Sequence, residues 1–71
     1  MNANTLGKII YDGREKQGIS KREFAKLLGV SERTISYWES IDIENSRRPK
    51  LSHLIQLSII LKIPIDMFIL L

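Results

Sequence analysis

The 71-residue chain lacks most of the residues from which catalytic and metal sites are built. It has no cysteine, which excludes disulfide bonds and thiolate ligands and fits a reducing compartment. Its one histidine, His53, has no second candidate ligand nearby and is expected on the surface of a helix. The sequence also has no glycine-rich phosphate loop and no cluster of carboxylates. We therefore expect a protein that is not an enzyme and that holds no cofactor and no metal.

The sequence contains no long uninterrupted apolar segment either. Such a segment would be needed for one continuous helix across a bilayer. The apolar stretch at 54–71 is broken by polar residues and a proline, namely Gln56, Ser58, Lys62, Pro64 and Asp66. The start of the chain, residues 1–5, has neither the positive nor the apolar region of a signal peptide. These absences favour a cytoplasmic protein.

What the chain does contain is the composition of a single folded domain over residues 1–71. Hydrophobic residues make up 44% and charged residues 27%, as in ordinary globular proteins, so disorder is not favoured. The net charge of +3 permits a polyanionic partner without requiring one. The positions of the charges are therefore more informative than their sum.

Hydrophobic spacing predicts an all-α fold, a compact bundle of about five short helices without strands. The segment at 40–50 mixes polar residues with Pro49 and has no clear period, so it is predicted to be a loop. Pro64 is expected in the first turn of the last helix. The predicted helices cover residues 5–16, 20 to the glycine at 29, 32 to about 39, 51–61, and a short segment through 66–69.

Local signals predict the helix ends and the buried faces. Thr5 and Ser31 are expected as N-caps, and Ser20 with Glu23 is expected to form a capping box. Gly13 lies inside the first predicted helix, where it costs about 1 kcal/mol relative to alanine, so a bulky side chain is expected over it. Apolar stripes predict the buried faces of the second and fourth helices as Phe24, Leu27 and Leu28, and as Leu51, Leu54, Ile55, Ser58 and Leu61.

The segment from Ser20 to Glu39 has a distinctive arrangement of apolar and small residues. The small residue Ala25 lies inside the second predicted helix, Gly29 follows that helix, and apolar residues stand at Phe24, Leu28, Val30, Ile35 and Trp38. This arrangement resembles the Cro/CI-type (XRE-like) helix-turn-helix family, and the resemblance extends from roughly Leu6 to Phe68. It implies a lambda-repressor-like DNA-binding domain that docks its third helix in the major groove.

The resemblance also implies which residues contact DNA. Arg33 is the strongest candidate for base reading because a guanidinium can bond bidentately to guanine. Without the resemblance, this polar face would be interpreted as solvated surface. The residues implied to face the bases are Ser31, Glu32, Arg33, Ser36 and Tyr37.

Two basic clusters flank the third helix and are expected to contact phosphates. Lys21 and Arg22 lie in the first turn of the second helix, and Arg47, Arg48 and Lys50 precede the fourth. The family usually has glutamine in place of Lys21, and lysine there is expected to favour a phosphate contact over a base contact. The alternative interpretation of the second cluster is a solvated loop.

The resemblance further implies a structural salt bridge between Arg14 and Glu39. The chain also departs from the family in the loop between Glu39 and Pro49, which is longer and lacks the usual glycine, and at Lys62, which replaces the glycine that usually ends the fourth helix. Residual apolar residues suggest a homodimer, a protein partner or a further C-terminal segment. These residues are Ile59, Ile69, Leu70 and Leu71.

The sequence therefore predicts a sequence-specific double-stranded DNA-binding transcriptional regulator. The expected mode is a repressor dimer on a palindromic operator, with half-sites about 34 Å apart. The chain would be either complete or the N-terminal part of a longer regulator. The alternative is a protein-interaction or antitoxin-like module of the same fold whose main partner is a protein.

Overall fold

The computed structural model describes residues 5–40 and 48–69, which contain helices and no strand. The all-α prediction is confirmed, and the helix boundaries lie within one or two residues of those expected. The loop predicted at 40–50 lies mostly outside the described residues. The helices are α1 (Thr5–Lys16), α2 (Lys21–Leu28), α3 (Glu32–Glu39), α4 (Leu51–Leu61) and α5 (Asp66–Ile69).

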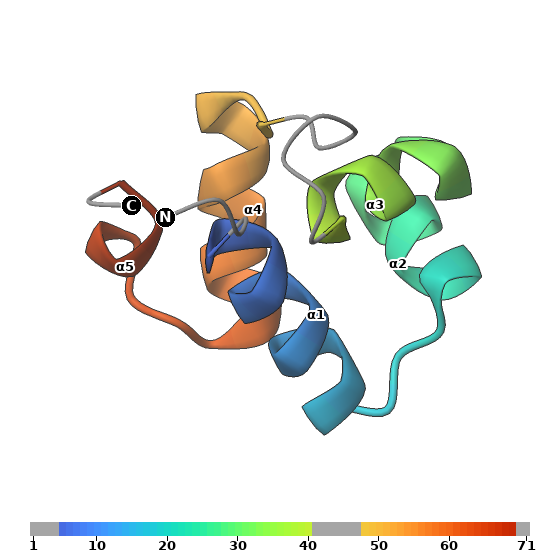
Figure 1. Cartoon of the computed structure of the whole chain (residues 1–71), viewed down its shortest axis with the longest axis horizontal. Helices are drawn as coiled ribbons and strands as arrows, with labels where there is room; N and C mark the ends of the chain where they lie inside the picture. Colours follow the sequence, from blue (N-terminus) through green and yellow to red (C-terminus); the bar gives the residue numbers. More distant parts are fainter. Residues whose placement is uncertain (1–4, 41–47, 70–71) are drawn as a thin grey trace.

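Helix α1 lies at the centre of the bundle (Figure 1). It packs against α3 on one side and against α4 on the other. Helix α2 packs on α3 and also reaches α4, while α5 lies at the far end beyond α4 (Figure 1). The α2–α3 pair therefore forms one side of the molecule, opposite α5.

Each helix contributes one large, fully buried side chain to the core. Because the helices are short, none can bury enough apolar surface alone, and tertiary packing must stabilise them. The shared core explains why the bundle forms one cluster around α1. The five side chains are Ile10, Phe24, Ile35, Leu57 and Phe68.

The helix ends follow most of the predicted signals. Ser20 Oγ accepts from the Glu23 N–H at 3.1 Å, and the Glu23 carboxylate accepts from the Ser20 N–H, which confirms the capping box. Ser31 Oγ caps α3 by accepting from the Thr34 N–H at 3.1 Å. Thr5 is the first residue of α1 rather than its cap, so that prediction is wrong. Pro64 precedes α5, and its carbonyl accepts from the Met67 N–H.

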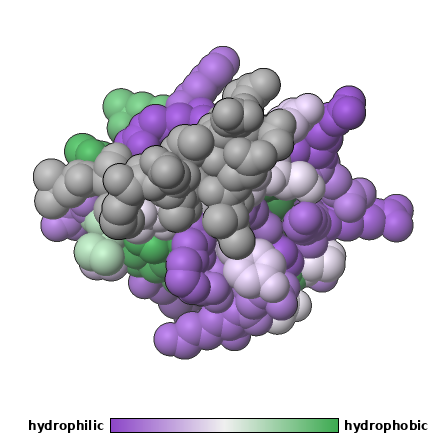
Figure 2. All heavy atoms as spheres, in the orientation of Figure 1, coloured by the Kyte–Doolittle hydropathy of each residue, from purple (hydrophilic) through white to green (hydrophobic). Residues whose placement is uncertain are grey.

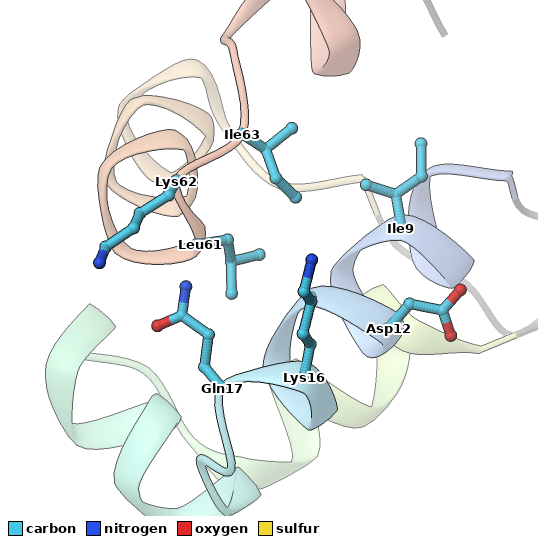
Figure 3. Close-up of a pocket in the computed structure, with 8 residues that line it drawn as sticks. Ile9, Asp12, Lys16, Gln17, Leu61, Lys62 and Ile63 are labelled. Carbon is cyan, nitrogen blue, oxygen red and sulfur yellow. The ribbon is translucent and has the colours of Figure 1, made fainter.

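The expected bulky neighbour of Gly13 is present. A Cβ at Gly13 would lie 3.2 Å from Leu61 Cδ1 and 3.3 Å from Ile63 Cδ1, so the glycine lets α4 approach α1 closely. A groove opens beside this contact (Figure 3), and none of the predicted site residues lines it.

The predicted buried face of α4 is wrong in part. Leu54 and Leu61 are buried as expected, but Leu57 replaces Leu51 and Ile55 in the core, and Ser58 is only half-buried. Nearly every side of α4 carries apolar residues, so more than one stripe has helical spacing and the pattern cannot choose between them. For the same reason, the predicted stripe of α2 includes Leu27, which is exposed.

Hydrophobic and hydrophilic residues gather on different parts of the surface. On the face seen in Figure 2, hydrophobic residues lie mostly on the side of α4 and α5, and the side of α2 and α3 is mostly hydrophilic. The largest exposed apolar residues of α4 and α5 are Leu51, Ile55, Ile59, Met67 and Ile69.

Candidate nucleic-acid interface

Helix α3 has one buried and one outward face. Ile35, Trp38 and Glu39 are buried against the bundle. The residues on the outward side are polar; Ser31, Glu32 and Arg33 are exposed, whereas Ser36 and Tyr37 are half-buried. The outward residues are Ser31, Glu32, Arg33, Ser36 and Tyr37, the same set that the resemblance assigned to DNA.

The turn before α3 fixes its angle to α2. Gly29 ends α2 with φ of +69°, a left-handed conformation that glycine adopts without strain. The Val30 N–H then donates to the Ala25 carbonyl at 3.0 Å. Ala25 is only 5% exposed, so its small side chain lies in the contact between the two helices. This geometry holds α3 rigidly while leaving its outward face open.

The end of α3 is tied to α1 by a buried ion pair. Arg14 Nε donates to Glu39 Oε2 at 2.7 Å, and Arg14 Nη2 donates to Oε1 at 3.1 Å. The side chains of both residues are almost fully buried. Arg14 also donates to the Ile19 carbonyl at 2.8 Å, so the same guanidinium fixes the α1–α2 connection. The hydrogen bond to Glu39 raises the pKa of Arg14, against the opposing effect of burial.

The first turn of α2 approaches the outward face of α3. Lys21 Nζ donates to Ser36 Oγ at 3.1 Å, and both side chains are partly buried. They share a groove with Tyr11, Asp12 and Glu39. Arg22, the neighbouring predicted phosphate contact, is exposed. The structure thus brings Lys21 together with a predicted base-facing residue.

The second basic cluster lies at the start of α4. Arg48 Nη2 donates to the Phe68 carbonyl at 3.1 Å, which ties this segment to α5. Lys50 occupies the N-cap position of α4 and is exposed, and Arg47 lies outside the described residues. Arg48 is also exposed, as a phosphate contact requires.

His53 is placed differently from the sequence prediction. Its ring lies 5.1 Å from the Trp38 ring, centroid to centroid, and the residue is half-buried rather than on the surface. Its Nδ1 atom is buried and has no hydrogen-bond partner among the described residues. The apolar spacing of the sequence predicted that Trp38 is buried, but it gave no sign that His53 contacts it from the other side of the loop. His53 therefore supports the back of α3.

Other kinds of site are not seen in the described part of the chain. Within residues 5–40 and 48–69, no three histidine, cysteine or acidic residues lie close enough to hold a metal ion. None of the helices found there has the length and apolarity needed to cross a membrane.

Helices α2 and α3 are thus joined by a left-handed turn at Gly29, and α3 keeps an open polar face. Residues 10–40 match the helix-turn-helix family model. The match covers α2, α3 and the C-terminal part of α1, and it confirms the resemblance to the Cro/CI-type family over that segment. A search of curated proteins finds no match to this chain. The helix-turn-helix supports a DNA-binding regulator, in which α3 is the second helix of the unit.

Proposed function

We propose that this protein is a sequence-specific double-stranded DNA-binding transcriptional regulator that places α3 in the major groove. The observation that carries the proposal is the open polar face of α3 inside a matched helix-turn-helix. That face is held from behind by the core and by the Arg14–Glu39 pair. The major groove of B-DNA is wide enough to admit such a helix.

The base-facing residues are those at and near the N-terminus of α3. Arg33 donates two hydrogen bonds to the O6 and N7 atoms of a guanine. Glu32 accepts from a cytosine amine or repels phosphate in a wrong register, and Tyr37 contacts a phosphate or a thymine methyl group. Ser31 and Ser36 have hydroxyl groups that can reach either a base or the backbone.

The phosphate contacts fix the position of α3 without reading sequence. Arg22 projects from the first turn of α2, and Arg48 and Lys50 precede α4 on the other side of α3. Arg47 belongs to the same cluster by sequence. Lys21 is a further predicted phosphate contact, and one of its three N–H groups donates to Ser36.

We further propose a cytoplasmic repressor that acts as a homodimer on a palindromic operator. Ile59 is 71% exposed and Ile69 is 52% exposed, on helices away from the polar face of α3. A two-fold interface there would leave both copies of α3 open for half-sites about one DNA turn apart. Leu70 and Leu71, which were predicted in the same interface, lie outside the described residues.

The same exposed apolar residues favour a second candidate, a protein-interaction or antitoxin-like module. In that case the surface of α4 and α5 would bind another protein, and the face of α3 would be solvated. The two candidates differ in whether the chain binds duplex DNA at all.

Selection of bound duplexes from a random-sequence library tests the proposal. A regulator of the proposed kind enriches a two-fold symmetric site, and the purified protein then prefers that duplex over a scrambled one. A variant in which Arg33 and Lys50 are replaced by neutral residues should lose the enrichment. Circular dichroism should show that this variant remains folded. Failure to retain any duplex at low salt would leave the protein-interaction candidate.

A further inference from the structure

The contact between Lys21 and Ser36 joins the two helices of the helix-turn-helix at its DNA-facing edge. The side chains come from positions fifteen apart in the sequence, and Nζ lies 3.1 Å from Oγ. Both are partly buried, and neither has another hydrogen bond within the described chain. Among the outward residues of α3, Ser36 thus receives a hydrogen bond from a cation on α2.

The chemistry of the two groups fixes the direction of this bond. An ammonium has three donors and no acceptor, so the oxygen of Ser36 must accept. One lone pair of the hydroxyl is then occupied by a positively charged donor, and such charge-assisted bonds are stronger than neutral ones. The Ser36 O–H is left to donate elsewhere, and the adjacent ammonium repels any further donor that approaches the oxygen.

We propose that Lys21 is a positioning residue for Ser36 and that the pair makes α3 select a hydrogen-bond acceptor on the facing base. The inference rests on the proposed DNA-binding function. In the major groove, guanine presents two acceptors, adenine presents N7 and thymine presents O4, whereas cytosine presents only an amine donor. The base contacted by Ser36 is therefore any base except cytosine.

This role differs from the phosphate contact expected from the sequence. A phosphate contact by Lys21 would strengthen binding to every duplex alike. The hydrogen bond directs Nζ to α3, inside a groove that Asp12 and Glu39 also line. In this position Lys21 acts on sequence preference through Ser36.

Library selection with four proteins tests the proposal: wild type, Lys21→Met, Ser36→Ala and the double variant. One position per half-site should favour guanine, adenine or thymine over cytosine by roughly five- to tenfold in the wild type, as expected for one hydrogen bond. Lys21→Met and Ser36→Ala should each reduce this preference to near equality, and the double variant should lose no more. Lys21→Arg, which keeps a cationic donor, should retain much of the preference.

Lys26→Met is the matched control because Lys26 is an exposed lysine of the same helix. It should leave the preference unchanged. The proposal is overturned if Lys21→Met weakens all duplexes equally and lowers the salt slope by roughly one unit. That result would make Lys21 a phosphate contact. It is also overturned if Ser36→Ala leaves the wild-type preference intact.

A measurement without DNA separates the positioning contact from the proposed function. Hydrogen exchange of the Lys21 ammonium, followed by NMR in the free protein, should be slower than that of Lys26. Ser36→Ala should remove the difference, and an unchanged rate would overturn the contact. Binding with a preference that does not depend on Lys21 overturns this inference alone. Absence of all duplex binding overturns the proposed function and this inference together.

Discussion

At the residue scale, the contact with the largest expected effect on folding is the Arg14–Glu39 ion pair. Two hydrogen bonds join the groups, and a third from Arg14 reaches the Ile19 carbonyl. Because both side chains are buried, desolvation offsets much of their attraction. The pair therefore contributes orientation of α3 more than net stability. Loss of Arg14 would nevertheless leave the buried Glu39 carboxylate without this partner, and loss of Glu39 would leave the buried guanidinium paired with Glu15 alone, whose side chain is 54% exposed.

Arg14→Ala or Glu39→Ala should lower the free energy of unfolding by about 3–5 kcal/mol, because the remaining buried charge loses its buried partner. Urea unfolding followed by circular dichroism would measure this. The matched control is Lys8→Ala, which removes a pair with Asp12 in which both side chains are more than half exposed. That variant should change stability by less than about 1 kcal/mol.

Replacement of both Arg14 and Glu39 by apolar residues of similar volume should be much milder than either single change, because no charge remains buried. Single variants that melt within about one or two degrees of wild type would contradict this explanation.

The raised pKa of Arg14 determines how the ion pair responds to pH. Because the pKa of Arg14 is higher in the folded than in the unfolded protein, its contribution to stability is fully present below the pKa of the unfolded state. That contribution is lost only as the pH rises through the pKa of the folded state. Arg14 should therefore cause no change in stability across neutral pH.

The base-facing role of Arg33 gives a prediction about affinity. Arg33→Ala should weaken binding to the selected duplex by about 1–3 kcal/mol and relax the preference at one base pair per half-site. Fluorescence anisotropy with the selected duplex and with single-base variants would measure both effects. Lys26→Ala serves as the control on the neighbouring helix. An equal loss on specific and random duplexes would instead make Arg33 a phosphate contact.

Residue-level prediction from the sequence succeeded where a pattern has one physical solution. Gly13 required a close neighbour, and Leu61 is found there. The outward set on α3 was implied by the resemblance to the Cro/CI-type family, and none of its members is buried. The contacts of Lys21 with Ser36 and of His53 with Trp38 were not foreseen, because each depends on how two helices face each other in space.

At the scale of the elements, the ends of α2 and α4 form a natural comparison. Both helices end in a residue of left-handed conformation, Gly29 with φ of +69° and Lys62 with φ of +58°. Glycine adopts this conformation freely, whereas a side chain costs about 1–2 kcal/mol. The Ser58 carbonyl accepts from the Lys62 and Ile63 N–H groups and so holds the strained end of α4.

Lys62→Gly should therefore raise the free energy of unfolding by up to about 1 kcal/mol, because relief of strain exceeds the added freedom of the unfolded chain. Gly29→Ala should lower it by about 1–2 kcal/mol. No heavy atom lies within 4 Å of a Cβ at Gly29, so this cost is conformational alone. Urea unfolding of both variants gives the comparison. A Lys62→Gly protein less stable than wild type would show that the lysine side chain stabilises the helix end.

Element boundaries were predictable because caps and glycines act locally, but the buried face of α4 was not. Its sequence is apolar on nearly every side, so the choice of Leu57 over Leu51 and Ile55 is made by the shape of the core. Local sequence carries no information about that shape. The same ambiguity leaves Leu51, Ile55 and Ile59 exposed on one helix.

At the scale of the whole molecule, the face seen in Figure 2 has a mostly hydrophilic side over α2 and α3 and a more hydrophobic side over α4 and α5. The first suits DNA and the second suits a protein surface. If the second is a homodimer interface, sedimentation of the wild type should depend on concentration. Ile59→Gln should shift the protein toward monomer and weaken binding to a palindromic duplex more than to a half-site.

Leu27→Gln is the matched control, since Leu27 is 57% exposed on α2, compared with 71% for Ile59 on α4. It should leave the association unchanged. A wild type that remains monomeric at high concentration, and that binds one copy per palindromic duplex, would contradict the dimer.

The most direct test of DNA binding through α3 and its flanking cations is the affinity for the selected duplex over a series of salt concentrations. Phosphate contacts release counterions, so the logarithm of the association constant should fall linearly with the logarithm of salt concentration. The slope should become shallower by roughly one unit for each of Arg22, Arg48 and Lys50 that is neutralised. An affinity for duplex DNA that does not change with salt, or no binding even at low salt, would contradict the proposed function.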